Sequence, residues 1–218
     1  MRVVKEAEER KGEILDSAER LFATKGFDNT STGDILDAVG IARGTLYYHF
    51  KSKEEILDGV IERMTNRLMQ NAREIARNKE LPVLERLTKA IMSLNVETKL
   101  GYEVMEQVHR PQNALMHQKM QMTLLAGINP ILTGLVEEGI EQGICHTQYP
   151  ESVVEMTMLY ANTAFDELNI SGFSPGQREK KIAGFIYNVE RLFGMKEGSL
   201  QEVIMEIFLG SWLGRRDN

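Results

Sequence analysis

The sequence predicts an all-α protein, and three features lead to this prediction. Apolar residues recur three and four positions apart through most of the chain, as they do along one face of an α-helix. Serine-led capping patterns mark helix starts, and glycines mark helix ends. The five prolines fall between or within the periodic stretches, where proline starts, ends or kinks a helix. Strand-like alternation is nowhere convincing, so the expected elements are helices only.

The first quarter of the chain predicts three helices joined by tight turns. The first is expected over 11–25 and ends at Gly26, because glycine readily adopts the left-handed backbone of a helix C-terminus. The second, over 31–39, starts at a serine cap and ends at Gly40. The third, over 43–50, follows after only two or three residues. Two short helices joined by a glycine turn make a helix-turn-helix.

Longer helices are expected in the remaining three quarters. The predicted ranges are 52–78, 82–99, 102–109, 112–142 with a break around Asn129 and Pro130, 150–168, 175–193 and 200–213. Capping boxes at Ser52, Ser174 and Ser199 predict three of these starts. The chain thus divides into an N-terminal domain, 1–51, and a helical domain, 52–218, which the helix from Ser52 is expected to join rigidly.

Charge is distributed unevenly along the chain. The formal net charge is −6, but residues 1–53 hold nine basic and nine acidic residues, so the whole deficit lies after them. Between residues 38 and 53 the only charged residues are Arg43, Lys51 and Lys53. An acidic protein does not coat nucleic acid non-specifically, so any such binding requires a shaped local patch.

Composition also bounds the compartment. No apolar run is long enough to span a bilayer, and no basic segment followed by an apolar one opens the chain. The single cysteine, Cys145, cannot form an intrachain disulfide. A cytoplasmic protein without membrane contact is therefore expected.

The third helix offers a set of side chains suited to DNA. The second helix of a helix-turn-helix lies in the major groove. Arg43 at its start can donate two hydrogen bonds to guanine, and Gly44 lets the backbone approach closely. Hydroxyl, imidazole and ammonium groups that follow can reach phosphates. We call this set the recognition surface; it comprises Arg43, Gly44, Thr45, Tyr47, Tyr48, His49 and Lys53.

Residues 11–57 closely resemble the DNA-binding domain of the TetR family of transcription regulators. The resemblance lies in A-x-x-L-F-x-x-K-G-F from Ala18, D-I-x-x-x-x-G-I from Asp34 and G-T-L-Y-Y-H-F-K-S-K from Gly44. It implies that the recognition surface contacts operator DNA, with further contacts at the start of the second helix, where Ser31 and Thr32 lie. Two departures are Ala42, where many members have serine, and Gly33, where a basic or polar residue is common.

The resemblance also implies a dimeric, effector-binding body. The helices expected at 150–168 and 175–193 would pair across a two-fold axis as a four-helix bundle. Their candidate contact residues are Val153, Met156, Tyr160 and Thr163 on the first, and Ile182, Phe185, Ile186, Val189 and Leu192 on the second. The alternative is that these residues face the core of their own subunit.

A small-molecule effector, whose identity the sequence does not reveal, is the expected ligand of the body. Methionines, which suit adaptable apolar cavities, crowd the middle of the chain, although such residues are more often plain core. The candidate ligand-binding residues are Tyr102, Met105, Glu106, His109, Met120, Tyr160 and Asp166. No metal or other cofactor is expected, because Cys145, His146 and the other histidines lack metal-ligand spacing.

These features predict a homodimeric repressor that binds double-stranded operator DNA and is released by its effector. The effector would favour an arrangement with wrongly spaced DNA-binding domains, and so would shift the population away from operator binding. Two alternatives are an enzyme, for which no nucleophile or phosphate-binding motif is found, and a helical adaptor that binds only proteins.

Overall fold

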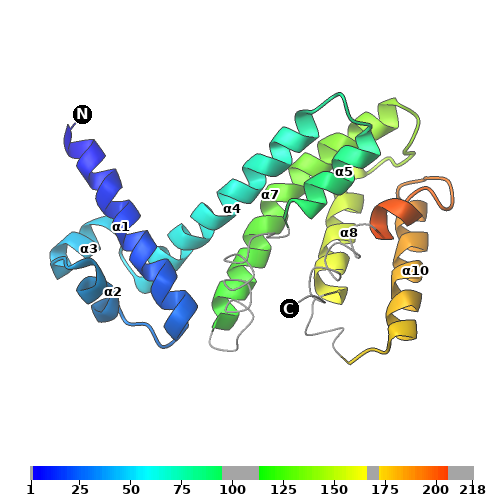
Figure 1. Cartoon of the computed structure of the whole chain (residues 1–218). Helices are drawn as coiled ribbons and strands as arrows, with labels where there is room; N and C mark the ends of the chain where they lie inside the picture. The colour runs from blue at the N-terminus through cyan, green and yellow to red at the C-terminus, as the bar shows by residue number, and fades with distance from the viewer. Residues whose placement is uncertain (1, 95–112, 166–171, 206–218) are drawn as a thin grey trace. The chain divides into compact units, whose positions relative to one another are not determined.

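A computed structural model of the chain describes residues 2–94, 113–165 and 172–205, with side chains from residue 6 onward. Every regular element in these ranges is a helix, so the prediction of an all-α fold is confirmed. The helices are α1 (Arg2–Lys25), α2 (Thr32–Val39), α3 (Arg43–His49), α4 (Lys53–Arg77), α5 (Val83–Met92), α7 (Ala114–Glu141), α8 (Pro150–Ala164) and α10 (Pro175–Leu192), followed by a helical stretch at 201–205 (Figure 1).

The described residues form two compact units. The head unit contains residues 2–67 and 113–123, and the body unit contains the remaining described residues. Helices α4 and α7 each have residues in both units. The predicted division into domains 1–51 and 52–218 stays a prediction. None of the described helices is both long enough and apolar enough to cross a bilayer.

The head unit buries one apolar face from each of its helices. Ile14 of α1, Ile35 of α2 and Leu46 of α3 are almost completely buried. Leu15 and Phe50 approach Gly59 of α4 so closely that a Cβ atom at this glycine would lie 3.0 and 3.4 Å from their side chains. The small residue therefore allows α1 and the end of α3 to pack directly against α4.

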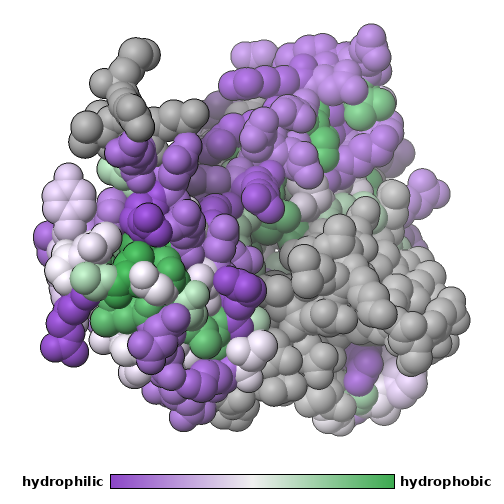
Figure 2. All heavy atoms as spheres, turned by 60° about the vertical axis from the view of Figure 1, so that its left-hand side comes forward, coloured by the Kyte–Doolittle hydropathy of each residue, from purple (hydrophilic) through white to green (hydrophobic). Residues whose placement is uncertain are grey.

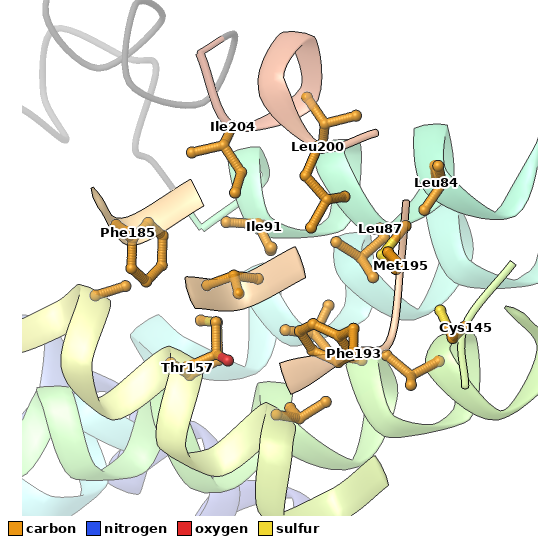
Figure 3. A pocket seen from close by; sticks show the side chains of 17 residues that line it. Leu84, Leu87, Ile91, Cys145, Thr157, Phe185, Phe193, Met195, Leu200 and Ile204 are labelled. Carbon is orange, nitrogen blue, oxygen red and sulfur yellow. The ribbon is translucent and has the colours of Figure 1, made fainter. Parts of the chain in front are cut away.

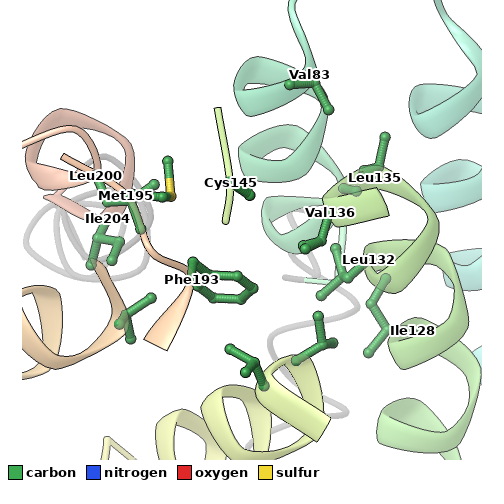
Figure 4. Packing of buried hydrophobic residues seen from close by; sticks show 14 of the residues in the cluster. Val83, Ile128, Leu132, Leu135, Val136, Cys145, Phe193, Met195, Leu200 and Ile204 are labelled. Atoms are coloured by element: carbon green, nitrogen blue, oxygen red, sulfur yellow. The ribbon is translucent and has the colours of Figure 1, made fainter. Parts of the chain in front are cut away.

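The body unit has a larger apolar core. It is built from the last part of α4, from α5, α7, α8 and α10, and from residues 145 and 193–204. It includes Val83, Leu132 and Phe193 (Figure 4). Gly194 adopts a φ of 62°, and a Cβ atom there would lie 2.5 Å from the His146 carbonyl oxygen. Glycine at this position therefore lets the segment after α10 lie against the segment after α7.

One ion pair is embedded in the same unit. The Arg86 guanidinium, only 2% exposed, donates to both carboxylate oxygens of Glu138, with a distance of 2.9 Å to Oε2. It also donates to the carbonyl oxygens of Ala76, at 2.9 Å, and Leu81, at 3.1 Å. Arg86 thereby ties the last turn of α4 and the loop after it to α5 and α7.

The starts of α2 and α4 follow the predicted serine caps. The Ser31 hydroxyl accepts from the Asp34 backbone N–H, and the Ser31 N–H donates to the Asp34 carboxylate, so α2 begins in a capping box. At α4 the Ser52 hydroxyl accepts from the Glu55 N–H at 3.1 Å, while the Glu55 carboxylate accepts from the Lys51 N–H. Gly40 ends α2 with a φ of 71°, as predicted.

Two predicted boundaries near the ends of the chain differ from the structure. Helix α1 begins at Arg2 rather than at residue 11, because the strong helix formers among residues 5–10 extend it. The final helix begins at 201 without the predicted Ser199 cap. The Ser199 hydroxyl donates to the Lys196 carbonyl instead, and the buried Glu190 carboxylate accepts from the N–H groups of Gly198 and Leu200 at 2.9 and 2.8 Å. A distant side chain therefore caps this turn.

Boundaries in the middle of the chain also differ. Helix α5 ends at Met92, where the Ser93 hydroxyl donates back to the Ala90 carbonyl, rather than at residue 99. The predicted break at Asn129 and Pro130 is wrong, because α7 continues through Pro130. Burial of Ile128 and Leu132 on either side of the proline offsets the lost hydrogen bond.

Helix α8 ends at Ala164, four residues before its predicted end. The capping box of α10 at Ser174 is confirmed, and α10 ends one residue before the predicted end. The helix predicted at 102–109 lies outside the described residues.

Candidate nucleic-acid interface and ligand cavity

Helix α3 presents most of the recognition surface to solvent because its opposite side is anchored. Leu46 and Phe50 are buried, at 1% and 3% exposure, and hold the helix on the head unit. Arg43 and Gly44 in the first turn are exposed, and Tyr47 and Tyr48 are 38% and 73% exposed. Thr45 and His49 are partly exposed. The tyrosines are therefore available to a partner.

The aromatic side chains of this helix also contact one another. The rings of Tyr48 and His49 lie edge to face, with centroids 5.0 Å apart. Lys51 donates through Nζ to the Tyr47 carbonyl at 3.1 Å, at the C-terminal end of α3. These contacts pre-order the end of the recognition surface. On the side of the molecule that carries α1–α3, hydrophilic residues surround a compact apolar area (Figure 2).

Lys53 is held differently from the other basic residues of the surface. Its Nζ lies 4.2 Å from the centroid of the Phe27 ring and donates to the Phe27 carbonyl at 2.9 Å. An ammonium has three hydrogens to donate, so two stay free for other acceptors. The contact places a positive charge beside the turn between α1 and α2.

The start of α2 carries the other two predicted DNA contacts. Ser31 is exposed and Thr32 is partly exposed. The Ser31 hydroxyl also donates to the Asp34 carboxylate at 2.7 Å. Lys25 donates to the same carboxylate at 2.6 Å, and with the Ser31 N–H and hydroxyl it lowers the pKa of Asp34. Ser31 is therefore already engaged in the cap, and Asp34 keeps its negative charge paired with Lys25.

The turn at Phe27 is fixed from a second direction. The buried Asn113 side chain, directly before α7, accepts from the Phe27 N–H at 2.6 Å and donates to the Phe22 carbonyl at 3.4 Å. The head unit thus contains a direct hydrogen-bonded link between the start of α7 and the α1–α2 turn.

The body unit contains an apolar cavity of about 120 Å³. Its walls come from α5, α7, α8 and α10, and from residues 145 and 193–204 (Figure 3). The lining includes Leu87, Leu132, Phe185 and Phe193. The Thr157 hydroxyl is buried in this wall and has no hydrogen-bond partner within the described residues.

Cys145 lines the same cavity and is buried. The adjacent His146 N–H donates to the Phe193 carbonyl at 2.8 Å, so backbone contacts hold two walls together. Burial raises the pKa of the Cys145 thiol, which therefore stays neutral at pH 7.

The predicted ligand-binding residues are scattered relative to this cavity. Tyr102, Met105, Glu106, His109 and Asp166 lie outside the described residues. Met120 is buried in the head unit, and Tyr160 is half exposed. Tyr160 stacks on Phe185, with centroids 5.7 Å apart, and so lies behind a cavity wall. Ligand roles for all seven stay predictions.

The aliphatic wall was missed by the sequence interpretation. Leu84, Leu87 and Ile91 fall at helical spacing, as any buried helix face does. Spacing therefore predicts that these residues are buried. Whether they line a cavity depends on how helices far apart in the sequence pack together.

The residues predicted to form the dimer contact divide into two groups. Ile182, Phe185, Ile186 and Val189 of α10 are buried in the core of their own chain, which was the alternative reading. Val153 of α8 is buried as well. The other candidate contact residues are exposed: Met156, Tyr160, Thr163 and Leu192. Leu159, which was not among the predicted contact residues, is 60% exposed on the same helix.

Comparison with known protein families identifies both parts of the chain. A family model described as bacterial regulatory proteins of the tetR family matches residues 14–60. A second, described as a tetracyclin repressor-like C-terminal domain, matches residues 97–185. The chain belongs to the TetR family. The first of these models covers the recognition surface, all of α2 and α1 from residue 14, as the sequence motifs predicted.

Individual TetR relatives match parts of the chain to different extents. The HTH-type transcriptional repressor KstR2 of Mycobacterium tuberculosis is 38% identical over 92 residues, which are 42% of this chain and 46% of KstR2. The matched stretch thus spans about half the length of that relative. The uncharacterized HTH-type transcriptional regulator YvaF of Bacillus subtilis is 28% identical over 80% of this chain and 92% of YvaF.

The fold is shared with solved structures. A crystal structure of RolR in complex with its ligand resorcinol has a TM-score of 0.61 and 16% identity, covering 92% of this chain and 95% of that one. The named relatives are transcription regulators rather than enzymes.

Proposed function

We propose that the chain is a homodimeric transcription repressor that binds a double-stranded operator in the cytoplasm and releases it when a small-molecule effector binds. The observation that carries this proposal is the exposure of Arg43, Tyr47 and Tyr48 on a helix whose other side is buried. Membership of the TetR family supports the same function.

The chemistry of the recognition surface favours DNA over a protein partner. Residues 41–53 contain no acidic residue but carry Arg43, Lys51 and Lys53. Arginine at the start of a recognition helix can read guanine, and the tyrosine hydroxyls and ammonium groups can contact phosphates. Ser31 and Thr32 at the start of α2 add a second phosphate-binding position.

Dimerisation is supported by the exposed apolar face of α8. Met156 is 58% exposed and Tyr160 51%, and with Leu159 they occupy one side of the helix. Large apolar side chains gathered on one face mark an interaction surface. A second copy of the chain would cover them and would present a second recognition helix, which a single short helix needs for tight operator binding.

Effector response is supported by the cavity in the body unit and by the continuity of α4. A ligand that binds more tightly to one arrangement of the two heads shifts the population toward that arrangement. We propose that the effector favours a head spacing that does not match the operator. Structures of the dimer with and without effector test this step, since equal head separation in both would contradict it.

The test of function begins with selection of bound sequences from random duplexes by the purified full chain. A selected duplex should be retained in gel shifts at low salt, and its affinity should fall steeply as salt rises, because bound phosphates release counterions. Metabolites are then screened for release of that duplex. Failure to retain any duplex at low salt would contradict the proposal and would favour the alternatives, a protein-binding adaptor or an enzyme.

A further inference from the structure

We propose that the effector is a small, uncharged and mainly hydrocarbon molecule, about the size of one six-membered ring, which occupies the cavity of the body unit and hydrogen-bonds the Thr157 hydroxyl. This inference names the ligand class of the proposed repressor, and so it rests on the proposed function. The size of the cavity, the chemistry of its walls and the unpaired Thr157 hydroxyl support it.

The size of the cavity limits the ligand. The volume is about 120 Å³. An engineered apolar cavity of about 150 Å³ in another protein stays dry and binds benzene. A molecule with one ring, or a short branched chain, therefore fits without movement of the walls. A larger ligand would have to displace side chains of residues 193–204, which form part of the lining (Figure 3).

The walls select against charge. None of the lining residues within the described part of the chain carries an ionised group, and the Cys145 thiol is neutral. An ion that enters such a cavity loses its hydration and finds no opposite charge, which is strongly unfavourable. The ion pair of buried Arg86 with partly exposed Glu138 does not line the cavity, and its charges satisfy each other.

Thr157 provides the polar contact. Its Oγ1 atom is buried without a hydrogen-bond partner in the described structure, although nearly all buried polar groups in proteins have one. Oγ1 does not face the cavity in the side-chain conformation described, so rotation about the Cα–Cβ bond must first exchange it with the methyl group. A ligand hydroxyl or carbonyl would then restore a hydrogen bond. An apolar ligand of the same shape would leave the hydroxyl unpaired. The cavity should therefore prefer a ligand with one neutral polar group.

The test uses the full chain and three probes that share a ring: benzene, phenol and benzoate. Titration calorimetry at pH 7 should give phenol about five- to tenfold tighter binding than benzene, the effect of one hydrogen bond, and no binding of benzoate. Thr157→Val keeps the shape of the side chain and removes the hydroxyl. It should remove the preference for phenol and make phenol bind more weakly than benzene, because the phenol hydroxyl then loses water without a partner, while benzene binding is not weakened.

Two further measurements locate the ligand. Ala161→Leu adds bulk to the cavity wall and should abolish binding of both neutral probes, with circular dichroism confirming the helical fold. Cys145 is the only thiol in the chain and lines the cavity, so phenol should slow its reaction with methyl methanethiosulfonate. If Ala161→Leu does not fold, the Thr157→Val comparison and the thiol measurement still decide the matter.

Binding of benzoate as tight as that of phenol would overturn the inference, and so would an unchanged preference for phenol in Thr157→Val. Gel shifts of the selected operator separate this inference from the proposed function. If the operator is retained but neither neutral probe binds, the ligand class is wrong and the repressor stands. If the probes bind as expected but no duplex is retained, the cavity chemistry is supported and the repressor function fails.

Discussion

At the scale of single residues, Lys53 combines two roles, and the sequence predicts only one of them. Lys53 carries a positive charge suited to a phosphate, and it also fixes the α1–α2 turn through the Phe27 carbonyl. The sequence motif predicts the first role from residue type. The second depends on a contact 26 positions away along the chain, which no local spacing encodes.

Replacement of Arg43 by alanine should relax base selectivity. A bidentate contact to guanine is worth about 1–3 kcal/mol of discrimination, so the loss should appear at one operator position only. Affinities for the selected operator and its single-base variants measure this effect. Arg20, exposed on α1, offers a control in Arg20→Ala, which should leave base selectivity unchanged.

Lys53→Ala should weaken binding to all duplexes alike and lower the salt slope by about one unit, since a phosphate contact carries no base information. Lys11, which lies 5.9 Å above the Phe50 ring, is a matched lysine for comparison. Lys11→Ala should leave the salt slope closer to that of the parent protein. Identical effects of Arg43→Ala and Lys53→Ala on selectivity and salt slope would contradict the roles assigned.

Glu138 should make stability depend on acid pH. The Arg86 guanidinium, together with Lys79, lowers the pKa of Glu138 to about 2, from an ordinary value of 4.5. The ionised pair therefore stabilises the fold fully above about pH 4.5, and this stabilisation is lost as pH falls toward 2.

Urea midpoints between pH 7 and pH 3 measure this dependence. Glu138→Gln should lower the midpoint at pH 7 and flatten its fall with pH, whereas Glu137→Gln, at an exposed neighbour, should change little. A pH profile for Glu138→Gln that parallels the parent profile would exclude the assignment.

At the scale of elements, local capping signals succeed where the partners are close in sequence. The capping box formed by Ser174 and Gln177 begins α10 as predicted, because these two residues are only three positions apart. The similar pattern at Ser199 fails, because the Ser199 N–H and hydroxyl both donate to the Lys196 carbonyl instead of taking part in a capping box. Pro130 predicts a break, but packing on both sides of it keeps α7 helical.

Asn113 joins two elements, and its loss should destabilise the head unit. Asn113→Ala removes the acceptor of the buried Phe27 N–H, which should cost about 1–3 kcal/mol. Chemical unfolding of the full chain measures the change. Asn29 lies in the same turn but is exposed, so Asn29→Ala should shift stability by less than about 0.5 kcal/mol. Equal losses in both variants would show that the link contributes nothing specific.

At the scale of the whole molecule, the proposed repressor requires two copies of the chain. The exposed Met156, Leu159 and Tyr160 of α8 provide the surface for that association. Burial of this apolar surface would drive dimerisation. A charged side chain introduced at the centre of the surface would lose its hydration on dimerisation without gaining an ionic partner.

Leu159→Glu should therefore convert the dimer to a monomer and weaken operator binding, while the helical content stays the same. Light scattering during size exclusion gives the mass. Gln148→Glu adds the same charge at an exposed position before α8 and should remain dimeric. A parent protein that is monomeric at micromolar concentration would refute this interface, and so would a dimeric Leu159→Glu.

By itself, the sequence determined the helical class, the helix-turn-helix and the identity of the outward residues on α3. These follow from residue spacing, from glycine at positive φ and from short-range caps, all of which act within a few residues. Only the tertiary structure decided which apolar stripes face their own core, that Glu190 caps a distant turn and that an apolar cavity remains in the body unit. These features arise where helices far apart in sequence meet, and their packing depends on all partners together.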